Sequence, residues 1–597
     1  MSDTLTDPAE LCIVPKPQSL QILEGSSELC ADARLVTANV LPLQRKTIRS
    51  VLAAAGIRVV ANKKKFIIEI NVVPAEELEM EDVPEAVRDD FYELEVCNNV
   101  VTVRTATQIG ALWGAQTLGW LYRSGGRGTF SPNFRIRDWS CQYEPGVFVD
   151  MARGGRYMLS ADWEQLMDRQ SFYKMKHLAA RVFGRPPSQG EHQGDLLCLP
   201  SGEEEEALAE PCIRHWFSVG NRDWQEDPMH QQIIADRMWG DLVTFCNERG
   251  LTLAAVVDPF GRYSQVPAVR TELSTVDADG NPTGKALCLS NPDVRTFLQE
   301  FFTEILKRDY PKGVHPFHLD VSENPAGTEC QCKACAGADA ADLCAQHQEW
   351  FVDMLLDNGV PEVWIWDGDK ATLARDGDRT MLKHPSVTAG ADADALNHAI
   401  EYVRVDDNDP LDFAPLARFA ARMWHGDDTD KSGVSEECVA DVVLGGGKRG
   451  ATFLDLCSRL EAIDKQLREM GSVSLYDARH TDGCMISLER VANDVDASAA
   501  NTAGALAEQG RTVHAEAMGM MTEEDRGTPA ETIRSLAGFG LVGTAMAEFL
   551  QAMAGDDRDA ARAAIESGIV AAQDVLPRWP ENIFVDEFSR VVAQFEG

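Results

Sequence analysis

Carboxylates stand at the ends of several apolar segments that are typical of buried strands. Glu323 ends the segment VHPFHLDVSE (314–323). A carboxyl group that is partly buried at a strand end has a raised pKa and can transfer a proton near neutral pH. We therefore interpret Glu323 as a candidate proton donor. Its candidate partners are the carboxylates at the end of this and two other apolar segments: Asp320, Asp258 and Asp367.

Two tryptophans stand beside one of these carboxylates. In PEVWIWDGD (361–369), Trp364 and Trp366 share one strand face and Asp367 follows at the strand end. Such an arrangement suits the C–H face and the hydroxyls of a sugar ring. Trp364 is equally suited to interior packing. Trp424 is a weaker candidate for contact with the same sugar ring. His318 is also a candidate substrate contact, although a hydrogen-bonded core histidine is the favoured interpretation.

A cysteine cluster forms the third set of chemically capable residues. Cys330, Cys332 and Cys335 form a C-x-C-x-x-C motif, and Cys344 and His347 follow. Three or four thiolates at this spacing can bind a tetrahedral structural Zn²⁺. The alternatives are free thiols or a disulfide, because no second C-x-x-C is present. A catalytic zinc is not expected, and no cofactor is expected to be required for catalysis.

The elements that must position these residues alternate between strands and helices from residue 136 to 475. Strands are expected near 136–143, 177–184, 251–261, 314–323, 361–369, 386–391, 401–407 and 450–457, and the clearest helices at 227–250 and 291–310. About eight strand–helix repeats predict a (β/α)8 TIM barrel, which places strand-end residues at its catalytic face. An open doubly wound sheet is the competing fold, but no nucleotide-binding glycine motif is present.

Two further regions flank the predicted barrel. Residues 1–135 predict a small α+β domain with a strand at 66–73, a hairpin at 92–105 that turns at Asn98-Asn99, and a helix at 107–124. Residues 476–597 are Ala-rich with helical periodicity and predict a helical C-terminal region for packing or oligomerisation. The sequence does not indicate an oligomeric state.

The amino-acid composition excludes some classes of function. The 597 residues contain 56 Lys+Arg and 95 Asp+Glu, which gives a net charge of −39. Such a chain repels phosphate backbones and anionic membranes, so no nucleic-acid or membrane partner is expected. The N-terminus has no signal-peptide pattern, and no long apolar run predicts a membrane span. The 15 cysteines, mostly scattered singly as at Cys288, favour reduced thiols in the cytoplasm.

Three stretches resemble glycoside hydrolase family 20, the β-N-acetylhexosaminidase group and its relatives. IVPKPQSLQ (13–21) with GALWGAQTLGWL (110–121) is similar to the non-catalytic α+β domain before the family's barrel. FRIRDWSCQYEPGVFVDMARGGRYMLSADWEQLMDRQSFYKMKHL (134–178) resembles its first barrel strand and helix. FHLDVSENP (317–325) resembles its fourth-strand motif His-x-Gly-Gly-Asp-Glu. These stretches stand in the order that the family shows.

The resemblance implies a reaction and a role for each residue of the motif. Glycosidic cleavage needs an acid for the leaving oxygen and a second group that stabilises the cationic sugar centre. Glu323 matches the family's acid. The second group there is the substrate's own 2-acetamido oxygen, which an enzyme Asp holds in place. Ser322 stands where that Asp is expected.

The sequence departs from the family pattern at several positions. Ser322 carries no negative charge and holds an amide N–H only weakly, while Asp320, where the family has glycine, could supply the missing carboxylate. Pro145-Gly146 replaces an Arg-Gly pair, so the arginine that grips sugar hydroxyls is missing. The third-strand motif ends in Arg262 instead of His.

These features lead to one main hypothesis and two alternatives. The main hypothesis is an exo-acting glycoside hydrolase that removes β-linked N-acetylhexosamine or a related sugar, with Glu323 as general acid. Hydrolysis of a different glycoside would pair Glu323 with Asp320, Asp258 or Asp367. The first alternative is a catalytically impaired carbohydrate-binding protein that retains the barrel. The second, a lyase or isomerase, would need a base and metal site that the sequence does not reveal.

Overall fold

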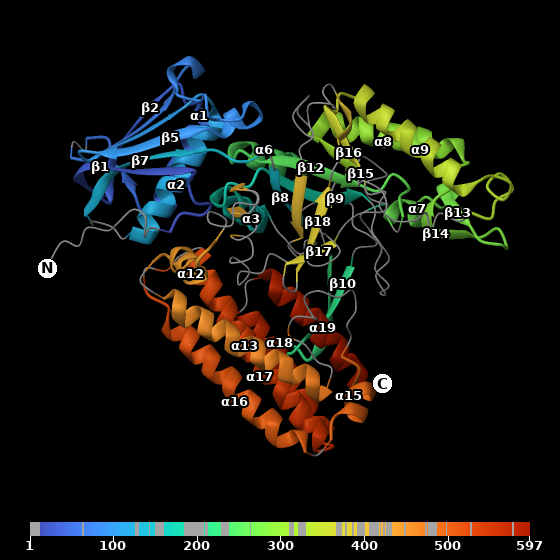
Figure 1. Cartoon of the computed structure of the whole chain (residues 1–597). Helices are drawn as coiled ribbons and strands as arrows, with labels where there is room; N and C mark the ends of the chain where they lie inside the picture. Colours follow the sequence, from blue (N-terminus) through green and yellow to red (C-terminus); the bar gives the residue numbers. More distant parts are fainter. Residues whose placement is uncertain are drawn as a thin grey trace.

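The computed structural model describes most of residues 12–596. The longer segments outside the described residues are 150–159, 184–207, 229–237, 310–315, 320–329, 366–372, 391–399, 405–416, 426–432 and 476–485. Three parts follow one another: an N-terminal sheet with two helices, a central sheet with flanking helices, and a bundle of long helices (Figure 1). One continuous hydrophobic core includes residues from all three parts. The predicted mixed α/β class, with an N-terminal sheet domain and a C-terminal helical region, is confirmed.

The N-terminal part is a seven-stranded sheet in the order β1-β7-β5-β6-β4-β2-β3. Helix α2 covers β4, β5 and β6 and packs against α1. Alternation of apolar and polar residues in β5 and β6 turns one face of the sheet toward this helix. Its elements are β1 (Ser19–Glu28), β2 (Asp32–Ala38), α1 (Pro42–Ala54), β3 (Arg58–Val59), β4 (Ile67–Val72), β5 (Tyr92–Cys97), β6 (Val100–Thr105), α2 (Gln108–Gly125) and β7 (Phe130–Asp138).

The predicted hairpin turn is present between β5 and β6. Asn98 and Asn99 have φ values of 52° and 63°, the left-handed conformation that a two-residue hairpin turn requires and that Asn tolerates. Asn99 Oδ1 also accepts a hydrogen bond of 2.7 Å from the Glu28 backbone N–H. The turn is therefore anchored to the end of β1 and holds the register of the hairpin.

The central sheet has nine strands in the order β17-β18-β20-β8-β9-β12-β15-β16-β19. From β20 to β16 all neighbouring strands are parallel, and the outer strands pair antiparallel. Among the described strands the sheet is open, so the closed barrel is not shown. The strands are β8 (Glu144–Val149), β9 (His177–Phe183), β12 (Thr252–Val257), β15 (Phe317–Leu319), β16 (Glu362–Ile365), β17 (Leu373–Asp376), β18 (Arg379–His384), β19 (Val387–Gly390) and β20 (Ile400–Arg404).

Helices and two small hairpins accompany this sheet. The predicted start of α8 is confirmed, because Asn291 Oδ1 accepts from the Asp293 N–H at 3.0 Å and Pro292 occupies the first turn. The helices are α3 (Ser160–Phe172), α6 (Met238–Glu248), α7 (Gln265–Val269), α8 (Pro292–Asp309) and α9 (Ala340–Asp357). The hairpins are β10 (Ile213–Ser218) with β11 (Asp223–Pro228), and β13 (Ser274–Val276) with β14 (Pro282–Leu287).

Three predicted elements differ from the structure. The strand expected at 136–143 is in part the end of β7, which pairs with β1 and β5 of the N-terminal sheet. The strand expected at 450–457 is helical, because its apolar residues continue at helical spacing through the next three turns. The first two residues of the helix expected at 227–250 belong instead to strand β11 (Asp223–Pro228), and the described part of the helix is α6 (Met238–Glu248).

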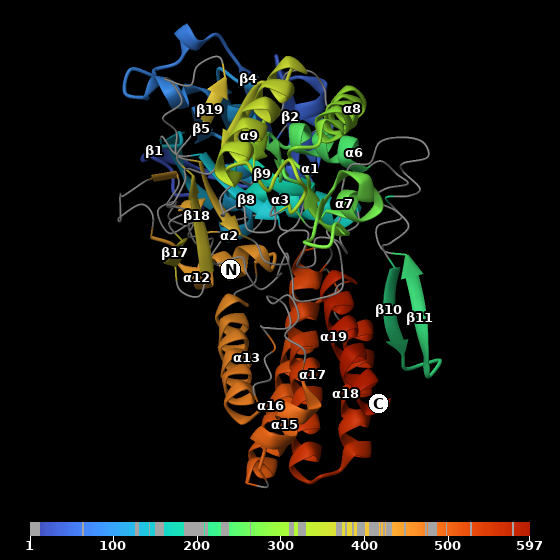
Figure 2. The same cartoon turned by 90° about the vertical axis from the view of Figure 1, so that its right-hand side faces the viewer.

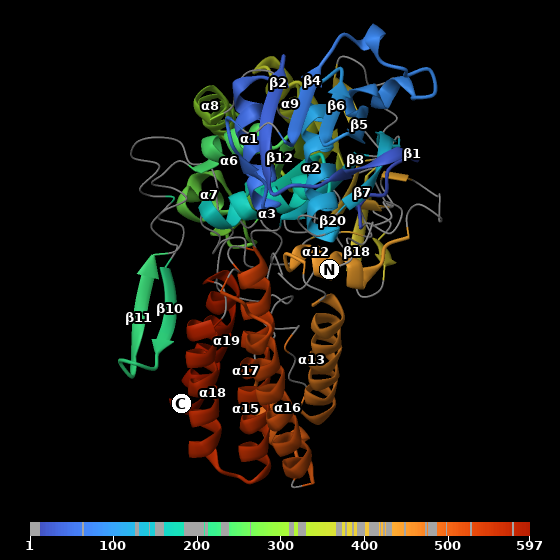
Figure 3. The same ribbon diagram turned by 90° about the vertical axis from the view of Figure 1, so that its left-hand side faces the viewer.

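The C-terminal part is a bundle of long helices that stands on one side of the central sheet (Figure 2, Figure 3). It includes α13, which precedes residue 476 and packs against α16 and α17. The β10–β11 hairpin reaches the bundle, where the Phe217 N–H donates to Ser589 Oγ at 2.8 Å. The helices are α12 (Glu436–Val443), α13 (Gly450–Gly471), α15 (Leu488–Asp494), α16 (Ala499–Gly519), α17 (Thr528–Ala554), α18 (Arg558–Val575) and α19 (Arg578–Glu596).

Helix α17 is the one described helix that is long and apolar enough to cross a membrane. Of its most apolar window, 72% is buried inside the bundle. Its neighbours are α13, α15, α16 and α18. The apolar residues of α17 therefore have protein partners, as expected for the central helix of a bundle.

Candidate functional site

Three neighbouring parallel strands end at the same level. Val257 of β12 pairs with Leu319 of β15, and Leu319 pairs with Ile365 of β16. The next residues in the chain are Asp258, Asp320 and Trp366, all of which are sequence-predicted site residues. Because parallel neighbours are about 4.8 Å apart, these three segments start side by side at the carboxyl edge of the sheet. This edge is the candidate site.

All three predicted catalytic residues and two of the predicted substrate contacts lie outside the described residues. This applies to Asp320, Ser322 and Glu323, and to Trp366 and Asp367. The backbone of Trp364 is described as part of β16, opposite His318 of β15, but its side chain is outside the description. The proposed roles of these residues stay predictions.

Asp258 is described in full, and it organises the turn after β12. Its carboxylate accepts from the Phe260 N–H at 2.9 Å through Oδ1 and from Arg262 Nε at 2.6 Å through Oδ2. The Gly261 N–H donates to the Asp258 carbonyl at 3.0 Å, and Gly261 has a φ of 62°. Asp258 is only 2% exposed. Its carboxylate therefore braces the turn and orients Arg262, which is a different role from the predicted direct contact with substrate.

Helix α9 also contacts the turn after β12. His347 Nε2 lies 2.9 Å from the Pro259 carbonyl oxygen, and because a carbonyl only accepts, Nε2 carries the proton. Burial lowers the pKa of His347 to about 4, although the bond to Pro259 acts in the opposite direction. The imidazole is thus neutral at physiological pH, and this contact makes His347 a support of the turn. It is not a member of the cysteine cluster.

His318 lies in the interior of the central sheet. It is 1% exposed in β15, which has β12 on one side and β16 on the other. This burial agrees with the core role that the sequence favoured for it.

Trp424, the weaker candidate for a sugar contact, is a core residue in this structure. The side chain is fully buried, and its Nε1–H donates to Asp138 Oδ1 at 2.9 Å. Lys174 Nζ lies 4.9 Å from the ring centroid, and Trp113 of α2 meets the ring edge-on. Trp424 is therefore part of the contact between the N-terminal sheet and the central part. The sequence could not show this, because Asp138 is 286 positions away in the chain.

The predicted cysteine cluster forms with one different member. The sulfur atoms of Cys330, Cys332 and Cys335 lie together with that of Cys288, all within 4.8 Å of one another. Cys344 is instead a buried residue of α9 outside this group. Cys288, which the sequence assigns to a scattered core thiol, follows β14 and approaches the motif through the β13–β14 hairpin. Apart from the presence of a cysteine, nothing in the sequence indicates that Cys288 lies near the motif.

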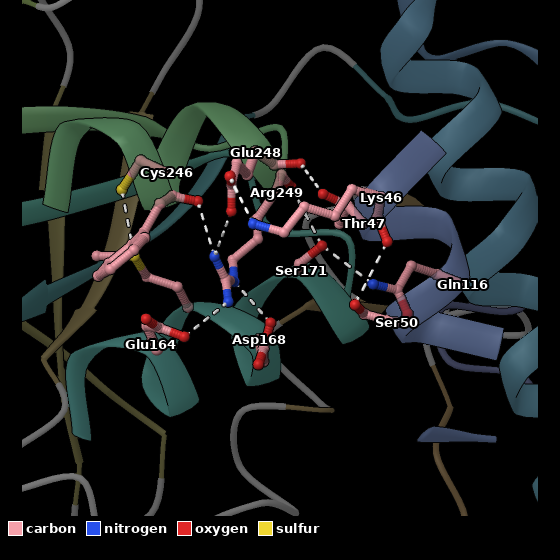
Figure 4. A network of polar contacts seen from close by, with 12 residues as sticks. Lys46, Thr47, Ser50, Gln116, Glu164, Asp168, Ser171, Cys246, Glu248 and Arg249 are labelled. Atoms are coloured by element: carbon pink, nitrogen blue, oxygen red, sulfur yellow. Dashed lines mark hydrogen bonds and ion pairs between the residues drawn. The ribbon is translucent and has the colours of Figure 1, made fainter. Parts of the chain in front are cut away.

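The opposite edge of the central sheet carries a polar network that joins the N-terminal part (Figure 4). Arg249, just before β12, pairs with Asp168 at 2.6 Å. Its carbonyl accepts from Ser171, whose hydroxyl in turn accepts from Gln116 of α2. A cavity of about 170 Å³ between α1, α2 and α3 adjoins this network. It lies at the amino ends of the strands and is therefore separate from the candidate site.

The N-terminal part of the chain matches a known domain family. Residues 10–139, about a fifth of the chain, match the family model described as glycosyl hydrolase family 20, domain 2. This confirms the family resemblance for the N-terminal part. No curated protein matches the chain in sequence.

Solved structures extend the likeness to the rest of the chain. Flavobacterium johnsoniae chitobiase is 12% identical with a TM-score of 0.53, and the match covers 98% of this chain and 99% of that protein. The β-N-acetylhexosaminidase of Bacteroides fragilis is 15% identical, with coverage of 59% and 66% and a TM-score of 0.44. The exo-β-N-acetylglucosaminidase of Vibrio harveyi, solved with N-acetylglucosamine, is 15% identical, with coverage of 59% and 54% and a TM-score of 0.44. The chain thus spans 66% and 54% of the length of these two enzymes, and its fold is similar to that of the chitobiase.

Proposed function

We propose that the protein is an exo-acting glycoside hydrolase that removes β-linked N-acetylhexosamine or a related sugar. Glu323 is the general acid in this proposal. The observation that carries it is the in-register ending of β12, β15 and β16, which starts the segments of Asp258, Asp320–Glu323 and Trp366-Asp367 side by side. The family match of residues 10–139 and the whole-chain likeness to a chitobiase support it.

The order of the parallel strands supports a barrel. Strands β8, β9, β12, β15 and β16 are neighbours in the same order in space as in the chain, each parallel to the next. Successive parallel strands in chain order are the arrangement of a (β/α)8 barrel, in contrast to the reversed order of a doubly wound sheet. We propose that these are the first five strands of such a barrel. Its carboxyl face is the place where substrates bind in this fold.

The chemistry assigns separate tasks to the residues at this edge. Glu323 donates its proton to the leaving-group oxygen as the glycosidic bond breaks, and the 2-acetamido oxygen of the substrate stabilises the cationic centre. Asp320 supplies the carboxylate that Ser322 lacks and holds the acetamido N–H. Trp366 faces the apolar side of the sugar ring. Arg262, held in place by Asp258, presents a cation at the neighbouring turn and takes the place of the missing arginine clamp.

The test measures hydrolysis of two substrates by the full-length protein. Release is measured from a p-nitrophenyl β-N-acetylglucosaminide and from unactivated chitobiose, alongside a panel of other glycosides. Glu323→Gln is expected to slow chitobiose hydrolysis by roughly 10²–10⁴-fold, the usual contribution of a general acid. The loss should be much smaller for the p-nitrophenyl substrate, because p-nitrophenolate leaves without protonation. Glu349→Gln, on the exposed face of α9, is the matched control and should retain full activity.

Other outcomes separate the alternatives. Equal losses of activity on both substrates in Glu323→Gln would contradict the role of Glu323 as the acid. Sugar-induced stabilisation without release from any substrate would instead identify a carbohydrate-binding protein. Activity confined to glycosides without a 2-acetamido group would exclude acetamido assistance.

A further inference from the structure

Four cysteine sulfurs meet where the residue after β14 approaches the chain before α9. Cys288 Sγ lies 3.6 Å from Cys330 Sγ, 3.9 Å from Cys332 Sγ and 3.8 Å from Cys335 Sγ. All four sulfurs lie within 4.8 Å of one another. We propose that Cys288, Cys330, Cys332 and Cys335 bind one structural Zn²⁺ ion.

The distances fit a tetrahedral ion. A Zn–S bond of about 2.3 Å in a regular tetrahedron places the sulfurs roughly 3.8 Å apart. The three distances from Cys288 differ from this value by no more than a few tenths of an ångström. The spacing is also too long for a disulfide bond, and each of the four is a free cysteine.

The surrounding groups suit thiolates. Two backbone N–H groups point at sulfur atoms: that of Val276 at Cys330 Sγ and that of Cys335 at Cys332 Sγ, each at 3.4 Å. The Ser290 hydroxyl lies 3.1 Å from Cys335 Sγ and can donate to it once the thiol is deprotonated. N–H and O–H donors of this kind orient metal-bound thiolates and disperse their charge.

The cluster lies at the edge of the main hydrophobic core, which includes Leu273 and Leu287 beside the β13–β14 hairpin. Among the described residues, the hydrophobic core clusters include none of the four cysteines. Backbone hydrogen bonds join the segments that carry the cysteines. The Gln331 N–H donates to the Val276 carbonyl at 2.9 Å, and the Cys288 N–H donates to the Leu273 carbonyl at 2.8 Å. A metal ion would add a cross-link between these segments that the apolar core does not supply.

Four protein ligands make this a structural site. A closed tetrahedral shell leaves no position for water or substrate, in contrast to catalytic zinc sites with three protein ligands. The ion would link the β13–β14 hairpin to the segment between β15 and α9 (Figure 1). Cys330 comes seven residues after Glu323, so the zinc would anchor one end of that segment. This last consequence depends on the proposed function, whereas the metal site itself does not.

The experiment measures metal in the full chain purified under reducing conditions without added zinc. Elemental analysis is expected to find one zinc ion per chain. Exchange for Co²⁺ should give the intense visible bands and the sulfur-to-cobalt charge transfer of a tetrahedral four-thiolate site. Cys288→Ser should reduce zinc to a trace. Cys344→Ala is the matched control and should retain the full zinc content, because Cys344 lies outside the cluster.

Several results would overturn this proposal. These are a metal-free folded protein that does not take up Co²⁺, iron in place of zinc, or zinc that is lost in Cys344→Ala but kept in Cys288→Ser. If Cys288→Ser does not fold, the cobalt spectrum of the unmodified chain still counts the thiolate ligands. Metal content is read independently of hydrolysis, so failure of the proposed enzymatic activity would leave the test valid.

Discussion

At the scale of single residues, a buried ion pair joins the N-terminal part to the central part of the molecule. Lys174 Nζ lies 2.8 Å from Asp138 Oδ2, and both side chains are fully buried. Tyr92 donates to the same carboxylate oxygen at 2.7 Å. Burial lowers the pKa of Lys174, while Asp138 opposes that shift. Each charge thus depends on the other to remain buried.

Asp138→Asn should therefore be strongly destabilising. Removing one partner leaves the Lys174 charge without compensation, which typically costs about 3–5 kcal/mol. Urea unfolding of the full chain measures the change. Glu95→Gln removes one partner of the exposed pair with Arg135 and should cost less than about 1 kcal/mol. A similar small loss for both variants would show that the buried pair is dispensable.

A second ion pair makes stability depend on pH. Asp525 Oδ2 lies 2.7 Å from Arg449 Nη1, and this hydrogen bond holds the pKa of Asp525 below its usual value. The pair therefore stabilises the fold above the unfolded carboxyl pKa, near pH 4, and the stabilisation disappears as pH falls through the folded pKa. Melting temperatures of the unmodified chain and Asp525→Asn should differ at pH 6 and converge at lower pH. A constant difference over this range would contradict the assignment.

At the scale of elements, glycines set the separation of the two most extensively packed helices. A Cβ on Gly540 of α17 would lie 2.8 Å from the Gly510 carbonyl oxygen and 2.9 Å from the His514 backbone N, both in α16. These are backbone atoms, so the helices would have to move apart. Close approach of α16 to α17 is thus a consequence of these small residues.

Gly540→Ala should lower the melting temperature of the protein, with an expected cost of about 1–3 kcal/mol for overpacking. Gly519→Ala, at the end of α16, is the comparison because a Cβ there meets no atom within 4 Å. That variant should be neutral or slightly stabilising, since Ala favours helix over Gly. Equal effects of the two substitutions would show that helix propensity, and not packing, determines the result.

At the scale of the whole molecule, the N-terminal sheet is joined to the central part by the buried Asp138 contacts and by the polar network of Figure 4. Thr47 of α1 donates to the Glu248 carbonyl at 2.8 Å, next to Arg249. Arg249 is 8% exposed and pairs with Asp168. The network therefore links α1 of the first part to α3 and α6 of the second.

Arg249→Met should loosen this junction and leave the helical bundle intact. Hydrogen exchange followed by mass spectrometry is expected to show faster exchange in α3, because the ion pairs of Arg249 with Glu164 and Asp168 are lost. Exchange in α16 and α17 is the internal reference and should not change. Faster exchange throughout the chain would instead indicate global destabilisation.

The sequence by itself determined the elements whose signals are local. The Asn98-Asn99 turn, helix α2 and the start of α8 follow from turn preference, apolar spacing and capping, which need no distant partner. The position of Asp258 at the end of β12 was also predictable, because it follows an apolar run that is typical of a buried parallel strand. The segment at 450–457 was misjudged because a short apolar run fits both a strand and a helix.

Tertiary structure decided which residues meet across long distances in the chain. Only the fold brings Cys288 to Cys330, covers Trp424 with Asp138 and Trp113, and turns both oxygens of Asp258 toward its own turn. Burial and partner choice depend on packing between elements that may be hundreds of residues apart, whereas helix and turn formation depends on neighbours in the sequence. The residue types indicated the available chemistry, and the packing determined which of them remain accessible to perform it.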